Sequence, residues 1–356
     1  MSTKDNCLTR RDFLKHTAFG VFGASIGIGY MGGLPPVSDG DDKQLPVNTR
    51  SRVIAVKKGG IMKDGKPDLT VIQRMMDEGM FALTGKKTTA GAWRSFFSPQ
   101  DVVGIKINPI AGKKLSTRPE VVHAIILSLL AAGVKENNII VWDRFEGHLM
   151  FAGYQLNKGS SGVRYYGTEQ TAGYNNEVYY ESEDDDPTIR EKNGVRSLFS
   201  NIATRQVTAI INVPVMKNHG IAGVTLCLKN LAFGVVNNTA RFHPSPYFCD
   251  PAISEICVHP AMQSKVRLHI VDALQACFDG GPVGMKPNMM WNEERLFFGT
   301  DPVAIDRIGL EIIDKKRKEH NRMPASRQAR HIITAGMKGL GVYDKNAIDI
   351  IELNVT

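Results

Sequence analysis

The stretches VVGIKIN at residues 102–108, TRPE at residues 117–120 and NIIVWD at residues 138–143 decide the fold class of this chain. The first and the last are short apolar runs rich in β-branched residues, which is typical of buried strands. The middle stretch predicts the start of a helix, with a capping box between Thr117 and Glu120 and a proline in the first turn. A strand, a helix and a second strand in this order predict a right-handed crossover unit of a parallel sheet.

The rest of the chain continues this alternation, apart from one segment. Apolar patterns predict strands at residues 52–57, 207–213, 266–271, 296–298 and 348–353, and helices at residues 69–83, 251–263, 302–318 and 326–338. We therefore expect a single α/β domain over residues 46–356, with a mainly parallel or mixed sheet flanked by helices in Rossmann-like layers. Residues 155–195 are rich in glycine, tyrosine and asparagine, so they form a lid, an inserted subdomain or a solvated surface excursion.

The N-terminal residues resemble a twin-arginine export signal. Arg10 and Arg11 are followed by Asp-Phe-Leu-Lys and then by a weakly apolar, glycine-rich stretch at residues 18–34. We therefore predict that the twin-arginine translocase exports the folded protein to the periplasm. No Ala-x-Ala cleavage site precedes Pro35, so retention of the signal as a membrane anchor stays open. Residues 1–45 are left out of the fold prediction.

Composition and net charge indicate which classes of partner the protein can bind. Hydrophobic residues make up 42% of the chain and charged residues 22%, as in soluble globular proteins. The net charge is +8, and residues 1–45 contribute none of it because they contain five basic and five acidic residues. A basic surface favours anionic partners. No basic helix or aromatic–basic motif is present, which argues against nucleic acid.

Four cysteines follow the signal: Cys227, Cys249, Cys257 and Cys277. An even number in an oxidising compartment is compatible with two disulfides or with buried thiols. A cysteine-ligated metal or iron–sulfur cluster is the alternative. It is less favoured because the spacing matches no close-spaced ferredoxin or zinc pattern.

Polar side chains sit at the ends of the apolar strands, where parallel α/β sheets bind ligands. Lys106 lies inside an apolar strand that Asn108 ends, so the lysine must face a pocket, a carboxylate or a sheet edge. After the strand at residues 207–213, the segment Lys217-Asn218-His219 is followed by Lys229-Asn230.

These two Lys-Asn pairs suit an anion site, because lysine supplies a point charge and asparagine orients it. His219 is then a general base or a metal ligand.

Two aspartates and a glycine-rich loop follow later in the chain. Asp272 comes directly after the strand at residues 266–271 and precedes GGPVG at residues 280–284. A carboxylate there would hold a divalent metal or orient a lysine. The loop lacks the lysine and hydroxyl of a nucleotide-binding loop. Asp306, in the helix that Asp301 is expected to cap, is a second candidate metal ligand.

Other residues carry less weight. Asp143 and Glu146 form a candidate carboxylate pair, and His243 could complete a site with His219. Serine-nucleophile elbows, HExxH, GxGxxG and CxxC motifs are all missing from the sequence.

The order of GIKIN, IIVWD, NVPVMKNHGIAGVTLCLKN, HIVDAL, GGPVG and GTDPVAIDRIG resembles the family called domain of unknown function 362, over about residues 53–310. The resemblance implies a shared fold and shared site positions. Many proteins of this family carry twin-arginine signals and ferredoxin-type iron–sulfur domains, but this chain lacks the ferredoxin cysteine pattern.

We therefore expect an exported enzyme that binds an anionic small molecule, a divalent metal or both. Its expected pocket consists of Lys106, Asn108, Lys217, Asn218, His219, Lys229, Asn230 and Asp272. The lysines would bind carboxylate or phosphate, Asp272 and Asp306 would hold a cation or orient a lysine, and His219 with Lys217 would be catalytic. The alternatives are a binding or maturation partner of a periplasmic redox enzyme and an iron–sulfur electron-transfer protein.

Overall fold

The structure is a computed structural model that describes residues 50–63, 65–182, 194–244 and 247–356. The expected twin-arginine signal, with Arg10 and Arg11, lies outside the described residues. Within the described ranges, no helix is both long and apolar enough to cross a membrane.

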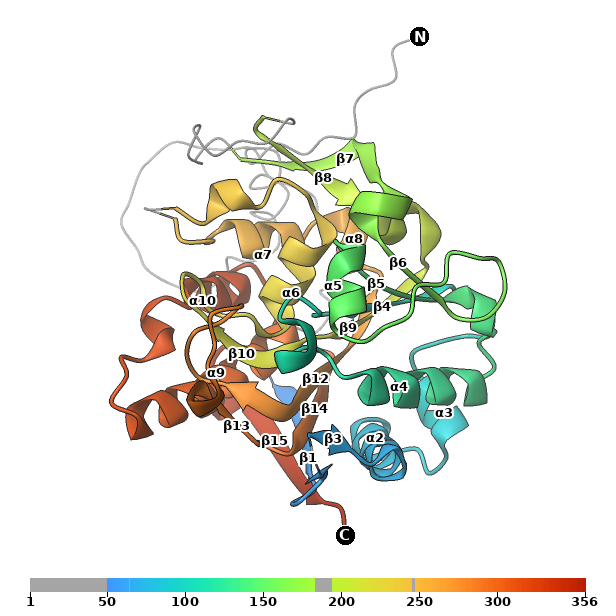
Figure 1. Ribbon diagram of the computed structural model, residues 1–356, viewed down its shortest axis with the longest axis horizontal. Helices are drawn as coiled ribbons and strands as arrows, with labels where there is room; N and C mark the ends of the chain where they lie inside the picture. The colour runs from blue at the N-terminus through green and yellow to red at the C-terminus, as the bar shows by residue number, and fades with distance from the viewer. Residues whose placement is uncertain (1–49, 64, 183–193, 245–246) are drawn as a thin grey trace, which may run out of the picture.

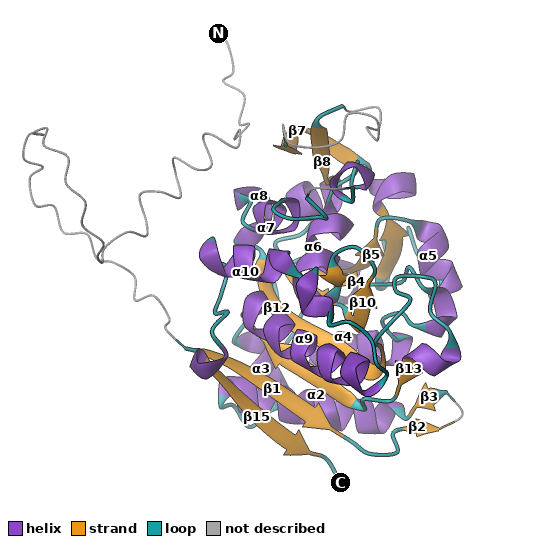
Figure 2. Cartoon of the chain, turned by 90° about the vertical axis from the view of Figure 1, so that its left-hand side faces the viewer, coloured by secondary structure: helices purple, strands orange, loops and turns teal. Residues whose placement is uncertain are grey.

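One large mixed sheet runs through the molecule (Figures 1 and 2). Its main path is, in spatial order, β15 (Ile348–Asn354), β1 (Ser51–Lys57), β14 (Arg295–Gly299), β12 (Val266–Cys277), β9 (Ala209–Val213), β4 (Val103–Ile107), β5 (Ile139–Asp143) and β6 (Arg164–Gly167). Along this path only β14 runs antiparallel to its neighbours. The predicted fold class, a mainly parallel or mixed sheet flanked by helices, is confirmed.

Short strands extend the sheet or form separate hairpins. β10 (Val215–His219) pairs parallel to β12, and β11 (Gly223–Val224) and β13 (Met290–Trp291) attach to β10 and β12. The separate hairpins are β2 (Met62–Lys63) with β3 (Lys66–Pro67), and β7 (Tyr174–Glu181) with β8 (Arg196–Ser200).

Helices cover both faces of the sheet and make three layers. One face packs against α2 (Leu69–Thr84), α3 (Thr89–Arg94), α4 (Pro119–Ala131) and α5 (Glu146–Phe151). The other packs against α6 (Leu226–Val235), α7 (Ala252–Cys257), α8 (Pro260–Gln263), α9 (Pro302–Glu319) and α10 (Arg330–Met337). Strand β1 shows why two cores form: Val53 and Ala55 enter one, and Ile54 and Val56 enter the other, because strand side chains alternate between faces.

The predicted strand–helix–strand unit is confirmed as β4, α4 and β5, and the two strands are parallel neighbours. The capping box is wrong. Arg118 is the N-cap of α4 and gives no side-chain cap, while Pro119 occupies the first turn. The Thr117 hydroxyl instead donates a hydrogen bond to the Val213 carbonyl at 2.7 Å and accepts one from the Asn108 backbone N–H at 2.9 Å. Thr117 therefore links the ends of two strands, β4 and β9, rather than capping the helix.

Three further boundaries differ from the prediction. The helix expected at residues 251–263 is split into α7 and α8, because His259 adopts the extended conformation that a following proline favours. Strand β12 continues to Cys277, so Asp272 lies inside the strand and not at its end. Residues 155–195 are not wholly an insertion, because β6 is an edge strand of the main sheet.

Candidate functional site

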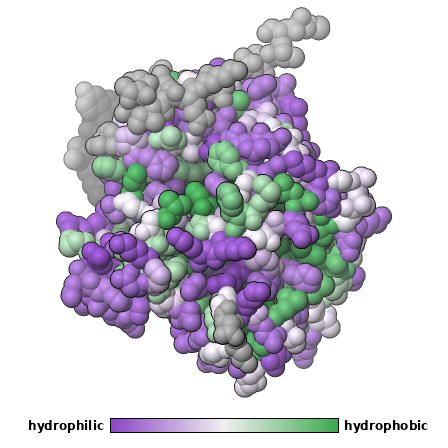
Figure 3. Space-filling view, viewed as in Figure 1, coloured by the Kyte–Doolittle hydropathy of each residue, from purple (hydrophilic) through white to green (hydrophobic). Residues whose placement is uncertain are grey.

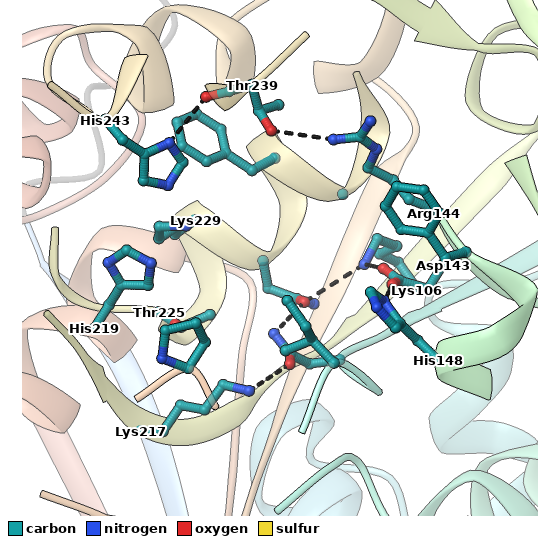
Figure 4. A pocket seen from close by; sticks show the side chains of 17 residues that line it. Lys106, Asp143, Arg144, His148, Lys217, His219, Thr225, Lys229, Thr239 and His243 are labelled. Atoms are coloured by element: carbon teal, nitrogen blue, oxygen red, sulfur yellow. Dashed lines mark hydrogen bonds and ion pairs between the residues drawn. The ribbon is translucent and has the colours of Figure 1, made fainter. Parts of the chain in front are cut away.

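A cavity of about 200 Å³ opens where the carboxyl ends of β4 and β5 meet β10 and α6 (Figure 4). Six of the predicted site residues line it: Lys106, Asn108, Lys217, His219, Lys229 and Asn230. They meet because β4, β5 and β9 are parallel neighbours, so their carboxyl ends share one edge of the sheet. Its volume suits a small molecule and exceeds the room that a single water needs.

Lys106 forms a compensated ion pair in one wall of this cavity. β4 lies between β9 and β5, so the edge-strand alternative for Lys106 is wrong. The Lys106 ammonium donates to Asp143 Oδ1 at 2.6 Å, to the Ile107 carbonyl at 2.6 Å and to Asn230 Oδ1 at 3.5 Å. Burial acts to raise the pKa of Asp143, but Lys106 and His148 bring it below its ordinary value, so the carboxylate stays ionised.

A glycine in α6 makes room for this lysine. A Cβ added to Gly234 would lie 2.0 Å from Lys106 Cε. Any other residue at this position would therefore displace the Lys106 side chain or the helix. The helical glycine costs some helix propensity, and the close approach of the ammonium explains its presence.

Lys217 and Lys229 form the opposite wall and lack such compensation. The Lys217 ammonium donates to Asn108 Oδ1 at 2.7 Å, and the Lys229 ammonium lies 4.5 Å from the centre of the Phe233 ring. Neither has a carboxylate of the described residues within ion-pair distance. Burial lowers the pKa of both amines, and that of Lys217 falls to about 7 with a contribution from the Lys229 charge.

The asparagines orient the lysines. Asn108 Nδ2 donates to Asn230 Oδ1 at 2.9 Å, and Asn230 Nδ2 donates to Asn212 Oδ1 at 2.8 Å. Asn212 Nδ2 donates in turn to the Cys227 carbonyl at 2.9 Å. The side-chain oxygens of Asn108 and Asn230 therefore face the two lysines, Lys217 and Lys106. Because both amides are engaged with protein partners, they position the ammonium groups and leave the lysines to meet a ligand.

Two histidines face the cavity beside Lys229 with opposite hydrogen-bonding character (Figure 4). His219 Nδ1 accepts the backbone N–H groups of Ile221 and Ala222 at 3.3 and 3.1 Å, so the neutral ring carries its proton on Nε2. His243 Nδ1 lies 3.0 Å from the Thr239 carbonyl and must donate to it, so its Nε2 keeps the lone pair.

Burial and the Lys229 charge lower the pKa of both rings, that of His243 to about 4, so both are neutral at pH 7. His219 Nε2 can therefore donate a hydrogen bond but cannot act as a base or bind a metal without losing its proton. The general-base role expected of His219 fits His243 instead. The sequence analysis named His243 only as a minor candidate that could complete a site with His219.

Asp272 and Asp306 do not line the cavity. The Asp272 carboxylate accepts the backbone N–H groups of Arg118 at 2.9 Å and Leu274 at 3.2 Å. The Asp306 carboxylate accepts those of Cys227 at 2.7 Å and Leu228 at 2.9 Å, at the start of α6. Each carboxylate thus holds the start of a helix, a position that favours negative charge, but burial outweighs this effect and raises the pKa of both, that of Asp306 to about 7. Neither aspartate therefore lies among the residues that line the cavity with His219, and their role as metal ligands stays a prediction.

Other expected ligands are also placed elsewhere. Asn218 Oδ1 accepts the Gly281 N–H at 2.9 Å and points away from the cavity lining. A Cβ at Gly281 would lie 2.1 Å from the Asn218 carbonyl, which explains a glycine in the GGPVG loop; Pro282 of that loop reaches the cavity. Among the described residues, no group of three or more His, Cys, Asp or Glu side chains is arranged to hold a metal ion.

The four cysteines are buried free thiols. They are Cys227, Cys249, Cys257 and Cys277. Of the alternatives that the sequence left open, the structure thus has thiols rather than disulfides. Cys277 lies beside Lys217 in the strand register, and its Sγ approaches the Asp279 carbonyl at 2.7 Å.

The family model for the domain of unknown function 362 matches residues 103–311. The chain belongs to this family. All three cavity lysines and all three cavity histidines, His148, His219 and His243, lie within the matched residues. The family's description names no activity, so membership by itself assigns no reaction.

Comparison with solved structures gives distant similarities. A lactate racemase apoprotein from Thermoanaerobacterium thermosaccharolyticum is 12% identical with a TM-score of 0.38; the alignment covers 76% of this chain and 58% of that one. A structural-genomics protein from Thermotoga maritima is 11% identical with a TM-score of 0.39, over 74% of this chain and 59% of that one. This chain therefore spans less than two thirds of either protein. No curated protein sequence matches it.

The sequence analysis did not predict several residues of the cavity or treated them as minor candidates. They are Ile110, Asp143, Arg144, Phe145, His148, Thr225, Phe233, Gly234, Thr239, His243 and Pro282. A signal existed for Asp143, because it ends the strand next to the one that contains Lys106. Arg144 is already engaged with Glu169 at 2.7 Å and Thr239 at 3.1 Å.

Some apolar side chains are exposed at or near this end of the sheet. Ile110 lines the cavity and is 38% exposed, and Phe151 of α5 is 71% exposed. Figure 3 shows that apolar side chains gather across the middle of the face drawn in Figure 1.

Proposed function

We propose that the protein is an enzyme whose cavity binds a small molecule with a carboxylate or phosphate group. The observation that carries the proposal is the pair of buried amines, Lys217 and Lys229, which face one cavity without a carboxylate partner among the described residues. An unpaired buried ammonium costs on the order of several kcal/mol. An anionic ligand would offset this cost, as Asp143 does for Lys106.

The geometry gives each group a part in binding. Lys229 is a point charge for the anionic group, and His219 Nε2–H is a second donor on the same side. His243 Nε2 is an acceptor that could take a proton from the bound molecule. The neighbouring Lys229 charge disfavours a second positive charge on either ring, so proton transfer through His243 would be transient.

A thermal-shift screen tests the binding proposal. Phosphorylated and carboxylated metabolites would be added to the wild type, to Lys229→Met and to Lys315→Met, which removes an exposed lysine of α9. We expect at least one class of anion to raise the melting temperature of the wild type and of Lys315→Met, and to have little effect on Lys229→Met. Equal shifts in all three proteins would show that the cavity is not the anion site.

Export by the twin-arginine route is part of the proposal and has its own test. Arg10→Lys with Arg11→Lys removes the paired arginines of the signal. We expect the wild type in the periplasmic fraction of a host with the twin-arginine translocase and the double variant in the cytoplasm. Periplasmic recovery of both would contradict this route.

A further inference from the structure

The three cavity lysines differ in how many partners each ammonium has. Lys106 has three oxygen acceptors, one of them a carboxylate. Lys229 lies against the Phe233 ring, an arrangement that favours the charged form. Among the described residues, Lys217 has one acceptor, the neutral amide oxygen of Asn108. Lys217 and Lys229 thus each have one neutral partner, and of these two it is the Lys217 nitrogen that a hydrogen bond fixes.

Lys217 is also placed as a nucleophile would be. It is fully buried, so water does not stabilise its charge, and it lines the cavity. The charges of Lys229 and Lys106 both disfavour a third positive charge at this point, while Asp143 acts in the opposite direction. Burial beside another cation is the arrangement that activates an amine for attack on a carbonyl group. The single bond to Asn108 fixes the nitrogen in place and leaves its other positions open to the cavity.

The strand pairing of Lys217 supports this role. Its partner in β12 is Cys277, a residue whose own pKa burial raises to about 11, so at this position the neighbouring strand supplies a neutral thiol and not a carboxylate. Lys106 has Trp142 as its partner in β5, and Asp143 follows directly. The strand register thus places a carboxylate next to Lys106 and a thiol next to Lys217.

We propose that Lys217 forms an imine with an aldehyde or ketone group of the ligand, so that the substrate class is an oxo acid or another small carbonyl compound with an anionic group. This inference rests on the proposed function, because Lys229 must hold the anionic group while Lys217 meets the carbonyl carbon. His219 Nε2–H would donate a hydrogen bond to the carbonyl oxygen, and His243 Nε2 would accept a proton.

Imine formation at Lys217 requires no oxidant or reductant. The lone pair of the neutral Lys217 amine forms a bond to the carbonyl carbon, and the π electrons of the C=O bond pass to oxygen, which takes up a proton. The nitrogen of the resulting carbinolamine loses a proton. The hydroxyl oxygen takes up the proton that the nitrogen lost, the C–O bond breaks and the oxygen leaves as water, and the nitrogen lone pair forms the C=N bond of a protonated imine, with a net uptake of one proton.

Reductive trapping tests the proposal. The full chain would be incubated with glyoxylate or glycolaldehyde phosphate and with cyanoborohydride, which supplies the hydride that converts an imine to a stable amine. Mass spectrometry of the intact protein and its peptides then locates the adduct. Acetaldehyde is the uncharged control, and the ion-paired Lys106 is an internal control in the same cavity.

We expect the adduct at Lys217 and none at Lys106. Lys217→Arg should abolish it, and Lys315→Met should not change it. Lys229→Met should slow trapping of the anionic aldehydes about tenfold or more, the effect of losing a charge-assisted contact, and should leave the rate with acetaldehyde unchanged.

The outcomes separate the two proposals. If the anionic aldehydes stabilise the wild type through Lys229 but leave no adduct at Lys217, the imine is refuted and anion binding stands. If the anionic aldehydes are trapped at Lys217 at the same rate in Lys229→Met, Lys217 is the nucleophile but Lys229 does not bind the anionic group. If the adducts fall on surface lysines and no stabilisation occurs, both proposals fail.

Discussion

Both walls of the cavity contain buried lysines, but only one wall contains a carboxylate that pairs with its lysine. On the β4–β5 wall, Lys106 is buried together with Asp143, and the pair is complete. On the β10–α6 wall, Lys217 and Lys229 are buried without a counter-ion among the described residues. The comparison teaches that burial alone does not identify a ligand site. The informative feature is a buried charge that the protein itself leaves uncompensated.

The largest expected effect comes from breaking the compensated wall. Lys106→Met removes the lysine partner of the buried Asp143 carboxylate and leaves His148, 3.9 Å away, as its remaining partner, so we expect the free energy of unfolding to fall by about 3–5 kcal/mol. The double variant Lys106→Met with Asp143→Leu should recover most of this loss. Urea denaturation measures all three proteins. A loss below about 1 kcal/mol in the single variant would mean that the ion pair does not compensate the buried charges.

The pH dependence of stability should come from the uncompensated wall. The pKa of Lys217 is about 7 in the folded protein, against 10.5 for a lysine in water, so the unfolded chain binds the extra proton. The free energy of unfolding should therefore fall as the pH drops from about 10 to about 7, by on the order of a few kcal/mol from this group.

Lys217→Met removes this dependence, because its side chain does not titrate. Its stability relative to the wild type should therefore rise as the pH falls through the same window. Urea denaturation at several pH values measures the difference. A difference that is constant with pH would show that Lys217 keeps an ordinary pKa.

Asn230 joins the two walls, and its truncation should have an intermediate effect. Its Oδ1 serves Asn108 and Lys106, and its Nδ2 serves Asn212. Asn230→Ala leaves buried partners unsatisfied, which should cost about 1–3 kcal/mol of unfolding free energy. Asn176→Ala, at an exposed position of β7, is the control and should change stability by less than about 0.5 kcal/mol. Equal losses in the two variants would show that the asparagine chain does not join the walls.

The smallest effect on stability should come from Lys229. Without ligand, Lys229→Met removes a buried charge that has no counter-ion, so the free energy of unfolding should stay the same or rise by about 1 kcal/mol. Thermal and urea unfolding of the ligand-free protein measure this. A loss as large as that of Lys106→Met would mean that Lys229 is as well compensated as Lys106.

The sequence predicted much of the fold, and six of its candidate site residues line one cavity. Apolar runs placed β4, β5 and β9, and parallel strands share one carboxyl edge, so Lys106 and Lys217 could be expected to meet. Asp272 shows the limit of this reasoning. Its strand was expected to end before it, yet β12 continues to Cys277, and the carboxylate turns to the start of α4.

Other features depend on contacts that no local pattern records. The proton positions of His219 and His243 follow from bonds to nearby backbone groups, and only the folded loops define these bonds. The same holds for Asp306, which holds the start of α6 although the two are far apart in sequence. Lys229 and Phe233 are four residues apart on one helix, so their contact could have been predicted.

Calorimetric titration tests the central claim most directly. The carboxylate or phosphate compound with the largest thermal shift would be titrated into the wild type, Lys229→Met and Lys315→Met. The account predicts that Lys229→Met binds about tenfold or more weakly, because a charge-assisted contact is lost, and that Lys315→Met binds like the wild type. Equal affinity in all three proteins would contradict the claim that the uncompensated wall is the anion site.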